Sequence, residues 1–351
     1  MCLGPVATPL TARSRTLLRR DHRTASAAGP QPRHGLRSLV PWFIGPALSV
    51  LTAGCSAHAE FATGAGPAAE ESNSCEYAIE SPPTAVVEAY QLDPAFYRRY
   101  CAVYGVPIIA PDGVDDEVLR ETGRLAAAVL GAAASDVRDA VHDRYLRIVI
   151  TAASTGQAFE DLPELADLFP EEASAAGLGP TPDFPAVVVR DSVILCRSRL
   201  DRPYATPPGD TLVHELGHAL LSMGLLQRPG TFAAYLLSAY EHARRDGLWQ
   251  RRIPDEVENV VSRELPRDNY LMSNPEEYFA TALSSYVGFK GITIGYGLRR
   301  ISSELAAVSE LRVHGPQEIG EIDPELTPLL QWALPHLIAP EHHCAEWLDN
   351  Y

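Results

Sequence analysis

Lysine is almost absent from this chain of 351 residues: Lys290 is the only one. Aspartate and glutamate number 45 against 29 lysine and arginine residues, which gives a formal net charge of −16. Proteins that bind nucleic acid need a cationic surface to neutralise the phosphates, so this balance argues against a nucleic acid as partner. Apolar residues make up 46% of the chain, which is enough for a packed core.

The apolar run at residues 39–53 is too short to cross a membrane. It holds about 15 residues, whereas a membrane-spanning helix needs about 20. Residues 1–54 carry seven arginines and one acidic residue, so their local charge is +6, and the rest of the chain carries −22. A positive segment before a short apolar core is typical of a signal peptide. We therefore expect residues 1–54 to be a signal peptide and the chain to be exported.

The signal-like segment ends in Leu51-Thr52-Ala53-Gly54-Cys55, which resembles a bacterial lipobox. In a lipobox the cysteine becomes the lipidated first residue of the mature protein, so the resemblance implies a membrane anchor through Cys55. Thr52 departs from the pattern, which has a leucine three places before the cysteine. Cleavage near Ala57 to Ala59, without a lipid, is the alternative. We expect a bacterial cell-envelope lipoprotein, periplasmic or at the surface, or else a secreted protein.

Hydrophobic periodicity divides the remaining chain into a linker and one α+β domain. Residues 55–74 are small and polar, which predicts a flexible linker. The domain at 75–351 is expected to have an α/β part at 75–205 and a mostly helical part at 206–351. In the first part we expect helices at 84–103 and 115–130, and strands at 106–110, 147–151, 186–189 and 192–196. In the second part we expect helices at 209–225, 231–245, 275–287, 301–312 and 324–333.

The cysteines after residue 55 lack CxxC spacing, which argues against a metal site built from them. There are four, an even number for an exported chain, so two disulfides are expected. Three pairings are possible. We expect Cys75 to pair with Cys101, because these two bracket one short segment, and Cys196 to pair with Cys344.

The segment His214-Glu215-Leu216-Gly217-His218 carries the strongest chemical signal. On a helix, two histidines four positions apart lie on one face and can share a zinc ion, and the adjacent glutamate can reach a water on that ion. Apolar residues flank the motif, and Asp210 can cap the start of the helix. The alternative is a buried helix whose two histidines are satisfied by hydrogen bonds.

A third ligand is missing from the places where two known patterns put it. Leu221 and Gly224 stand where HExxHxxGxxH has its glycine and last histidine. The segment Gly230-Thr231-Phe232-Ala233-Ala234 lacks the acid that the aspartate-ligand pattern has after its Gly-Thr pair. The remaining option is a glutamate from a later helix, in Asn274-Pro275-Glu276-Glu277. Asn274 and Pro275 are typical of a helix start. We expect Glu277 to be the ligand, with Glu276 as the alternative.

The pairing of HELGHAL with NPEEYFA, 63 residues from His214 to Glu277, resembles the gluzincin metallopeptidases related to the catalytic domain of anthrax lethal factor. In that family the third ligand begins an EYFAE stretch. The resemblance implies a zincin-like fold with the active-site helix between the two parts of the domain, and zinc held by His214, His218 and Glu277. The family's second glutamate corresponds to Thr281 here, which removes a carboxylate that orients a ligand.

The resemblance also implies an activity, that of an exported zinc metalloendopeptidase acting on a peptide or protein substrate. Glu215 would be the general base, and Tyr270, seven residues before Glu277, would support the oxyanion. The alternative is a non-catalytic binding lipoprotein that keeps the zincin fold. Glu215 favours the enzyme, because a structural zinc has no use for a base. His342 and His343 beside Cys344 form a second possible metal pair or a solvated tail.

If Cys55 is lipidated, Cys55→Ser should release the protein from membranes and abolish the incorporation of a labelled fatty acid, because no acceptor thiol remains. Membrane fractionation and mass measurement of the mature N-terminus check this. A soluble wild-type protein that begins near Glu60 would show simple secretion instead.

Overall fold

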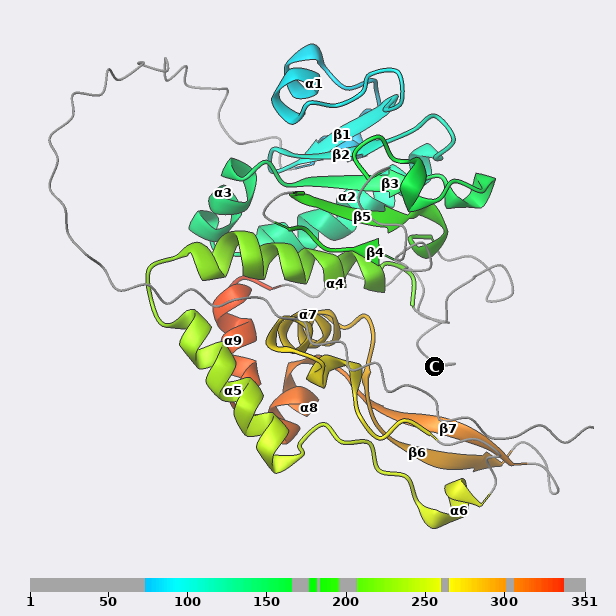
Figure 1. Ribbon diagram of the computed structural model, residues 1–351, viewed down its shortest axis with the longest axis vertical. Coiled ribbons are helices and arrows are strands. Elements are labelled where there is room, and N and C mark those ends of the chain that lie inside the picture. The colour runs from blue at the N-terminus through cyan, green and yellow to red at the C-terminus, as the bar shows by residue number, and fades with distance from the viewer. Residues whose placement is uncertain are drawn as a thin grey trace, which may run out of the picture. The chain divides into compact units, whose positions relative to one another are not determined.

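The computed structural model describes residues 73–165, 177–181, 184–195, 207–259, 265–300 and 306–337. The described part belongs to the mixed α+β class that the sequence predicts (Figure 1). No helix in these ranges is long and apolar enough to cross a membrane. The predicted signal peptide lies outside the described residues, as do Cys55, Cys196, Cys344 and the histidine pair His342 and His343.

A five-stranded mixed sheet contains the predicted strands at 106–110, 147–151 and 186–189. The three central strands run parallel, and an antiparallel strand pairs at each edge. Every residue of the central strands is buried, as expected for a sheet that is covered on both faces. In spatial order the strands are β1 (Arg99–Val103), β2 (Val106–Ala110), β3 (Arg147–Thr151), β5 (Ala186–Arg190) and β4 (Gly177–Leu178).

Successive side chains of the strands enter two cores, one on each face of the sheet. Ile148 belongs to the larger core, which is covered by helices. Its neighbour Val149 belongs to the smaller core, which Phe159 closes. Helices of the larger core include α2 (Asp116–Ala132), α3 (Ser135–Asp143) and α4 (Asp210–Ala219).

The residues after β5 form helices and a hairpin. Helix α4 continues through a π turn, Leu220–Gly224, into a 3-10 turn, Leu225–Gln227. Helix α4 lies between the five-stranded sheet and helix α7 (Pro275–Tyr286), and it contacts both (Figure 1). The remaining helices and the hairpin strands are α1 (Thr84–Tyr90), α5 (Phe232–Asp246), α6 (Asp255–Glu258), α7 (Pro275–Tyr286), β6 (Ile292–Arg300), β7 (Ala306–Val313), α8 (Gly315–Ile322) and α9 (Leu326–Ala333).

The helix predicted at 301–312 is wrong over its described residues, because Ala306–Val313 is strand β7. This strand pairs antiparallel with β6, for example Tyr296 with Glu310. Strand pairing outweighs the helix propensity of this segment, because it supplies hydrogen-bond partners for the backbone groups of both strands. Apolar residues alternate from Ile292 to Leu298, which is typical of a strand. The helix prediction for 301–312 did not take this neighbouring strand into account.

Two predictions in the first part are also wrong. Helix α1 ends at Tyr90, and Gln91 takes a left-handed conformation with φ of 52°, so the predicted helix at 84–103 stops early. The last residues of the predicted helix form strand β1 instead. A two-residue turn, with positive φ at both Tyr104 and Gly105, joins β1 to β2. The strand predicted at 192–196 is instead a 3-10 turn, Asp191–Val193, over its described part.

Helix α3 was not predicted from the sequence, although Val137 and Val141 on it have helical spacing and are buried. The neighbouring helix α2 and strand β3 were both predicted. The short helix between them packs against the π turn that follows α4. Its position therefore depends on a segment distant in the sequence.

Cys75 and Cys101 form the predicted disulfide, which ties the turn Ser74–Glu76 to strand β1. Both cysteines are fully buried in the larger core. Helix α2 packs directly on the bridge, since a Cβ added to Gly123 would lie 2.5 Å from Cys75 Cβ. The disulfide thus anchors the start of the described domain.

Replacing both Cys75 and Cys101 with alanine should lower the free energy of unfolding by about 3 kcal/mol, because the bridge closes a loop of 26 residues in the unfolded chain. Urea denaturation of the double variant and of the wild type measures this. An unchanged midpoint, or free thiols at both positions in the wild type, would contradict the assigned pairing.

Candidate metal centre

Helix α4 carries the predicted motif and is fixed by burial along one side. Leu212, Val213 and Leu216 are fully buried in the larger core, so the helix cannot rotate about its axis. His214 and His218 lie on the side that faces α7 and keep about 17% of their side-chain surface exposed. The histidines are therefore held in place by the apolar side of their own helix.

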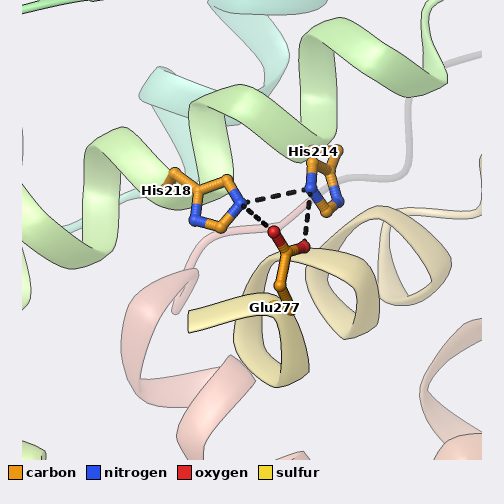
Figure 2. Close-up of side chains that lie close together, drawn as sticks. All are labelled: His214, His218 and Glu277. Atoms are coloured by element: carbon orange, nitrogen blue, oxygen red, sulfur yellow. Dashed lines mark hydrogen bonds and ion pairs between the residues drawn. The ribbon is translucent and has the colours of Figure 1, made fainter. Parts of the chain in front are cut away.

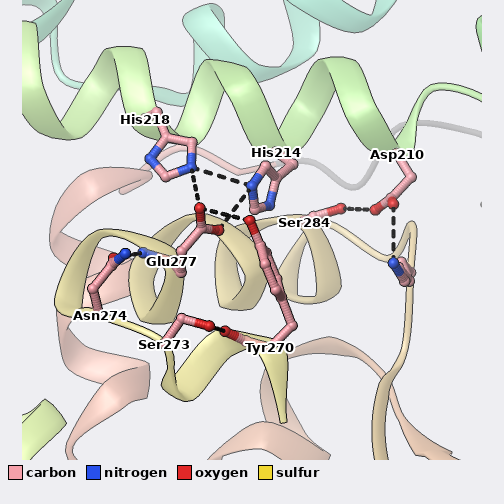
Figure 3. Close-up of polar contacts among 9 residues, drawn as sticks. Asp210, His214, His218, Tyr270, Ser273, Asn274, Glu277 and Ser284 are labelled. Carbon is pink, nitrogen blue, oxygen red and sulfur yellow. Dashed lines mark hydrogen bonds and ion pairs between the residues drawn. The ribbon is translucent and has the colours of Figure 1, made fainter. Parts of the chain in front are cut away.

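The start of α4 differs from the prediction. Gly209, with φ of +78°, is the N-cap residue, so Asp210 is the first residue inside the helix. The buried Asp210 carboxylate instead accepts a hydrogen bond from Ser284 Oγ on α7 (Figure 3). This bond joins α4 to α7 beside the histidines.

Helix α7 brings Glu277 to the site, and it starts as the sequence predicts. The side chain of Asn274 accepts a hydrogen bond of 2.7 Å from the backbone N–H of Glu277, and Pro275 occupies the first turn. This cap fixes the first turn of the helix, and the Glu277 carboxylate points toward α4 (Figure 2). The neighbouring Glu276 is exposed and is absent from the metal-binding group.

A glycine within the motif allows α4 and α7 to approach closely. A Cβ added to Gly217 would lie 3.0 Å from the Cα atom of Ala280 on α7, which is shorter than an ordinary contact. The small residue at each position lets the two backbones pack together. Gly217 therefore sets the distance between Glu277 and the histidines, a role that the sequence analysis did not assign to it.

The three predicted ligands converge on one point, and their ligand atoms all lie within 4.8 Å of one another (Figure 2). Nε2 of His214 is 3.1 Å from Nε2 of His218 and 3.1 Å from Oε2 of Glu277. Nε2 of His218 is 3.6 Å from Oε1 of Glu277. Bond lengths of about 2.0–2.1 Å in a tetrahedral zinc site place the ligand atoms about 3.3 Å apart, so the residues fit this ion.

A buried carboxylate at this point also favours a cation. The Glu277 Oε2 atom is buried and lies 3.1 Å from His214 Nε2. Burial alone would raise the pKa of the Glu277 carboxyl, but hydrogen bonds and charge from His214 and His218 outweigh it and hold that pKa well below its usual range. The carboxylate is thus ionised and faces two imidazole nitrogens, which is the donor set of a catalytic zinc site.

Tyr270 reaches the same point from the 3-10 turn Tyr270–Met272. Its hydroxyl donates a hydrogen bond of 2.8 Å to Oε1 of Glu277 (Figure 3). Burial of the hydroxyl, this hydrogen bond and the negative charges of Glu277 and Glu215 raise the pKa of Tyr270 above its usual value. The ring edge is open to solvent, since the residue is 58% exposed, so Tyr270 is a neutral proton donor at the rim of the site.

Glu215 is buried beside the metal-binding group, with only 8% of the residue exposed. The edge strand β4 passes over it, and the glycines there make room. A Cβ on Gly177 would lie 3.0 Å from Glu215 Oε1, and a Cβ on Gly179 would lie 3.0 Å from Oε2. These glycines were not predicted as part of the site, because nothing local in the sequence relates them to the motif.

Thr281, one turn after Glu277 on α7, lines a cavity of about 350 Å³ next to His214 and Glu215. Its Oγ1 atom is buried and has no hydrogen-bond partner among the described residues. The carboxylate that the resemblance would place here is missing. Among the described residues, Asn274, Tyr270 and the packing of the two helices position the Glu277 side chain.

No protein-family model matches the chain, and no curated protein matches it. Among solved structures the chain is similar to the Pro-Pro endopeptidase of Paenibacillus alvei, with 16% sequence identity and a TM-score of 0.36. The match covers 64% of this chain and 95% of that chain.

Glu277→Ala should lower zinc affinity by more than the roughly 10–100-fold that follows loss of an outer hydrogen-bond partner, because it removes a direct ligand. Glu276→Ala is the matched control, and its affinity should equal that of the wild type. Competition with a chromogenic chelator measures both. Loss of zinc in Glu276→Ala but not in Glu277→Ala would move the third ligand by one residue.

Proposed function

We propose that this protein is an exported zinc-dependent metalloendopeptidase of the gluzincin type, which hydrolyses peptide bonds with a zinc-activated water. The convergence of His214, His218 and Glu277 supports this proposal most strongly. Glu215 stands on the same helix as the two histidines, beside a cavity that can admit a substrate group. A zincin-like fold is the corresponding proposal for the described domain.

A bound zinc ion would lower the pKa of a water toward ~7 and polarise the scissile carbonyl. Glu215 then takes the proton of the attacking water and passes it to the leaving amine.

Tyr270 supplies the second proton-bearing group. Its raised pKa keeps the hydroxyl protonated at neutral pH, so that it can donate a hydrogen bond to the developing oxyanion. In the structure this hydrogen bond goes to Glu277. During turnover Tyr270 exchanges that acceptor for the oxyanion, a short movement for a side chain at the rim of the site.

A purely structural zinc is the competing explanation of the ligand set. Structural zinc sites are closed by four protein ligands, whereas catalytic sites keep one position open. The described residues supply three ligands here, and a buried glutamate stands beside them. The second candidate function, a binding lipoprotein without activity, is favoured only by the threonine at position 281.

Export fits the structure at one point. Cys75 and Cys101 are disulfide-bonded, and disulfides persist in oxidising compartments outside the cytoplasm. Anchoring through a lipid on Cys55 is part of the proposal and rests on the sequence alone.

Two substitutions separate catalysis from metal binding. Glu215→Gln should keep zinc and stability but lose nearly all peptidase activity, because the base is removed and its shape is retained. Tyr270→Phe should lower kcat on the order of 10²-fold with little change in zinc content, because it removes one hydrogen bond to the oxyanion. Turnover of a fluorogenic peptide library, with zinc content measured on the same samples, gives both values.

A wild-type protein with full zinc occupancy and no turnover on any peptide would overturn the peptidase proposal. In that case both substitutions would be silent, and the binding-lipoprotein function would replace the enzyme. Activity of Glu215→Gln equal to that of the wild type would remove the assigned base.

A further inference from the structure

We infer that the cavity beside the metal centre recognises a carboxylate of the substrate through Lys290. This inference rests on the proposed peptidase function and names a substrate class for it. The cavity has a volume of about 350 Å³ and shares His214 and Glu215 with the metal centre. A substrate group in it is therefore next to the scissile bond.

Lys290 is the only lysine of the chain, and it lines this cavity. Its Nζ atom forms a long ion pair with Oδ2 of Asp210 at 3.9 Å, which is beyond hydrogen-bond distance. The ammonium group makes no hydrogen bond to a described residue, and 40% of the side chain is exposed. Three N–H donors are thus available at the cavity wall.

The backbone around Lys290 is rigid. The preceding residue, Phe289, is 2% exposed, and its N–H donates a hydrogen bond of 3.0 Å to the carbonyl of Ser284. The following Gly291 packs so closely on His314 that a Cβ would lie 2.4 Å from its ring. Lys290 is therefore held at the cavity by its neighbours.

The carboxylate nearest to Lys290 is that of Asp210, and it is buried. Asp210 accepts the hydrogen bond from Ser284 Oγ, and its side chain is only 7% exposed. A substrate cation therefore has poor access to that carboxylate. A substrate carboxylate can instead reach the exposed ammonium group of Lys290.

A second cation strengthens this preference. Arg251 also lines the cavity, and its Nη1 donates to the carbonyl of Pro266 at 3.4 Å and to Tyr296 Oη at 3.3 Å. Its Nε atom is buried without a hydrogen-bond partner among the described residues. Glu310, the acid on the adjacent strand, accepts hydrogen bonds from Thr293 and Arg312. The positive charge of Arg251 therefore adds to the potential that a substrate carboxylate meets.

The carboxylate has two sources, an acidic side chain near the scissile bond or the free C-terminus of a short peptide. Peptide sets distinguish them. One set carries Glu, its isostere Gln, or Lys at each position flanking the cleaved bond, with an amidated C-terminus. The other set keeps Gln throughout and compares free with amidated C-termini.

The zinc-loaded full chain should cleave the preferred carboxylate peptide with a kcat/KM roughly tenfold above its neutral counterpart, the size of one hydrogen bond to a charged group. Lys290→Gln should bring this ratio close to one. Lys290→Arg should restore it, and Lys290→Glu should favour the Lys peptide. Arg245→Gln removes an exposed cation on α5 that does not line the cavity, and should leave the ratio unchanged.

Binding provides a readout that does not depend on turnover. In the Glu215→Gln background, the Kd of the same fluorescent peptides should show the same preference and the same loss on Lys290→Gln. Carboxylate binding that depends on Lys290, without any hydrolysis by the wild type, would keep this inference and overturn the proposed function. Cleavage with a ratio that Lys290→Gln does not change, or with a wild-type preference for Gln or Lys peptides, would overturn the inference and keep the function.

Discussion

The close packing of α4 against α7 is the contact on which the metal centre depends. The two histidines and Glu277 come from helices 63 residues apart, and they meet because Gly217 and Ala280 let the helix backbones touch. A larger side chain at either position would separate the helices by a few tenths of an ångström or more. That distance matters for a site whose ligand atoms must lie about 2 Å from one ion.

A buried acid behind α7 keeps the helix from shifting. Asp323, 1% exposed, accepts a hydrogen bond of 2.6 Å from Tyr278 Oη and one of 2.9 Å from Trp249 Nε1. Burial and then the charge of Asp323 raise the pKa of Tyr278, so the tyrosine stays a donor. Tyr278 follows Glu277 directly, so this network helps to hold helix α7 in place.

The turn that carries Tyr270 is supported in a similar way. The Tyr240 hydroxyl on α5 donates a hydrogen bond of 2.9 Å to the carbonyl of Met272, and Ser273 Oγ donates one of 2.6 Å to the carbonyl of Tyr270. Both bonds fix the backbone of the turn and leave the Tyr270 ring at the rim. This combination of a fixed backbone and an open side chain suits the donor role that we propose for Tyr270.

The sequence by itself determined the features that depend on neighbouring residues. These are the spacing of His214 and His218 on one helix face, the helix start at Asn274 and Pro275, and the buried strands at 106–110, 147–151 and 186–189. Tertiary structure decided what depends on distant segments. Strand β7 and the hairpin turn at Tyr104 form because pairing between strands outweighs local preference. The Gly217 contact, the close approach of the glycines to Glu215 and the cavity at Lys290 exist only once separate elements pack together.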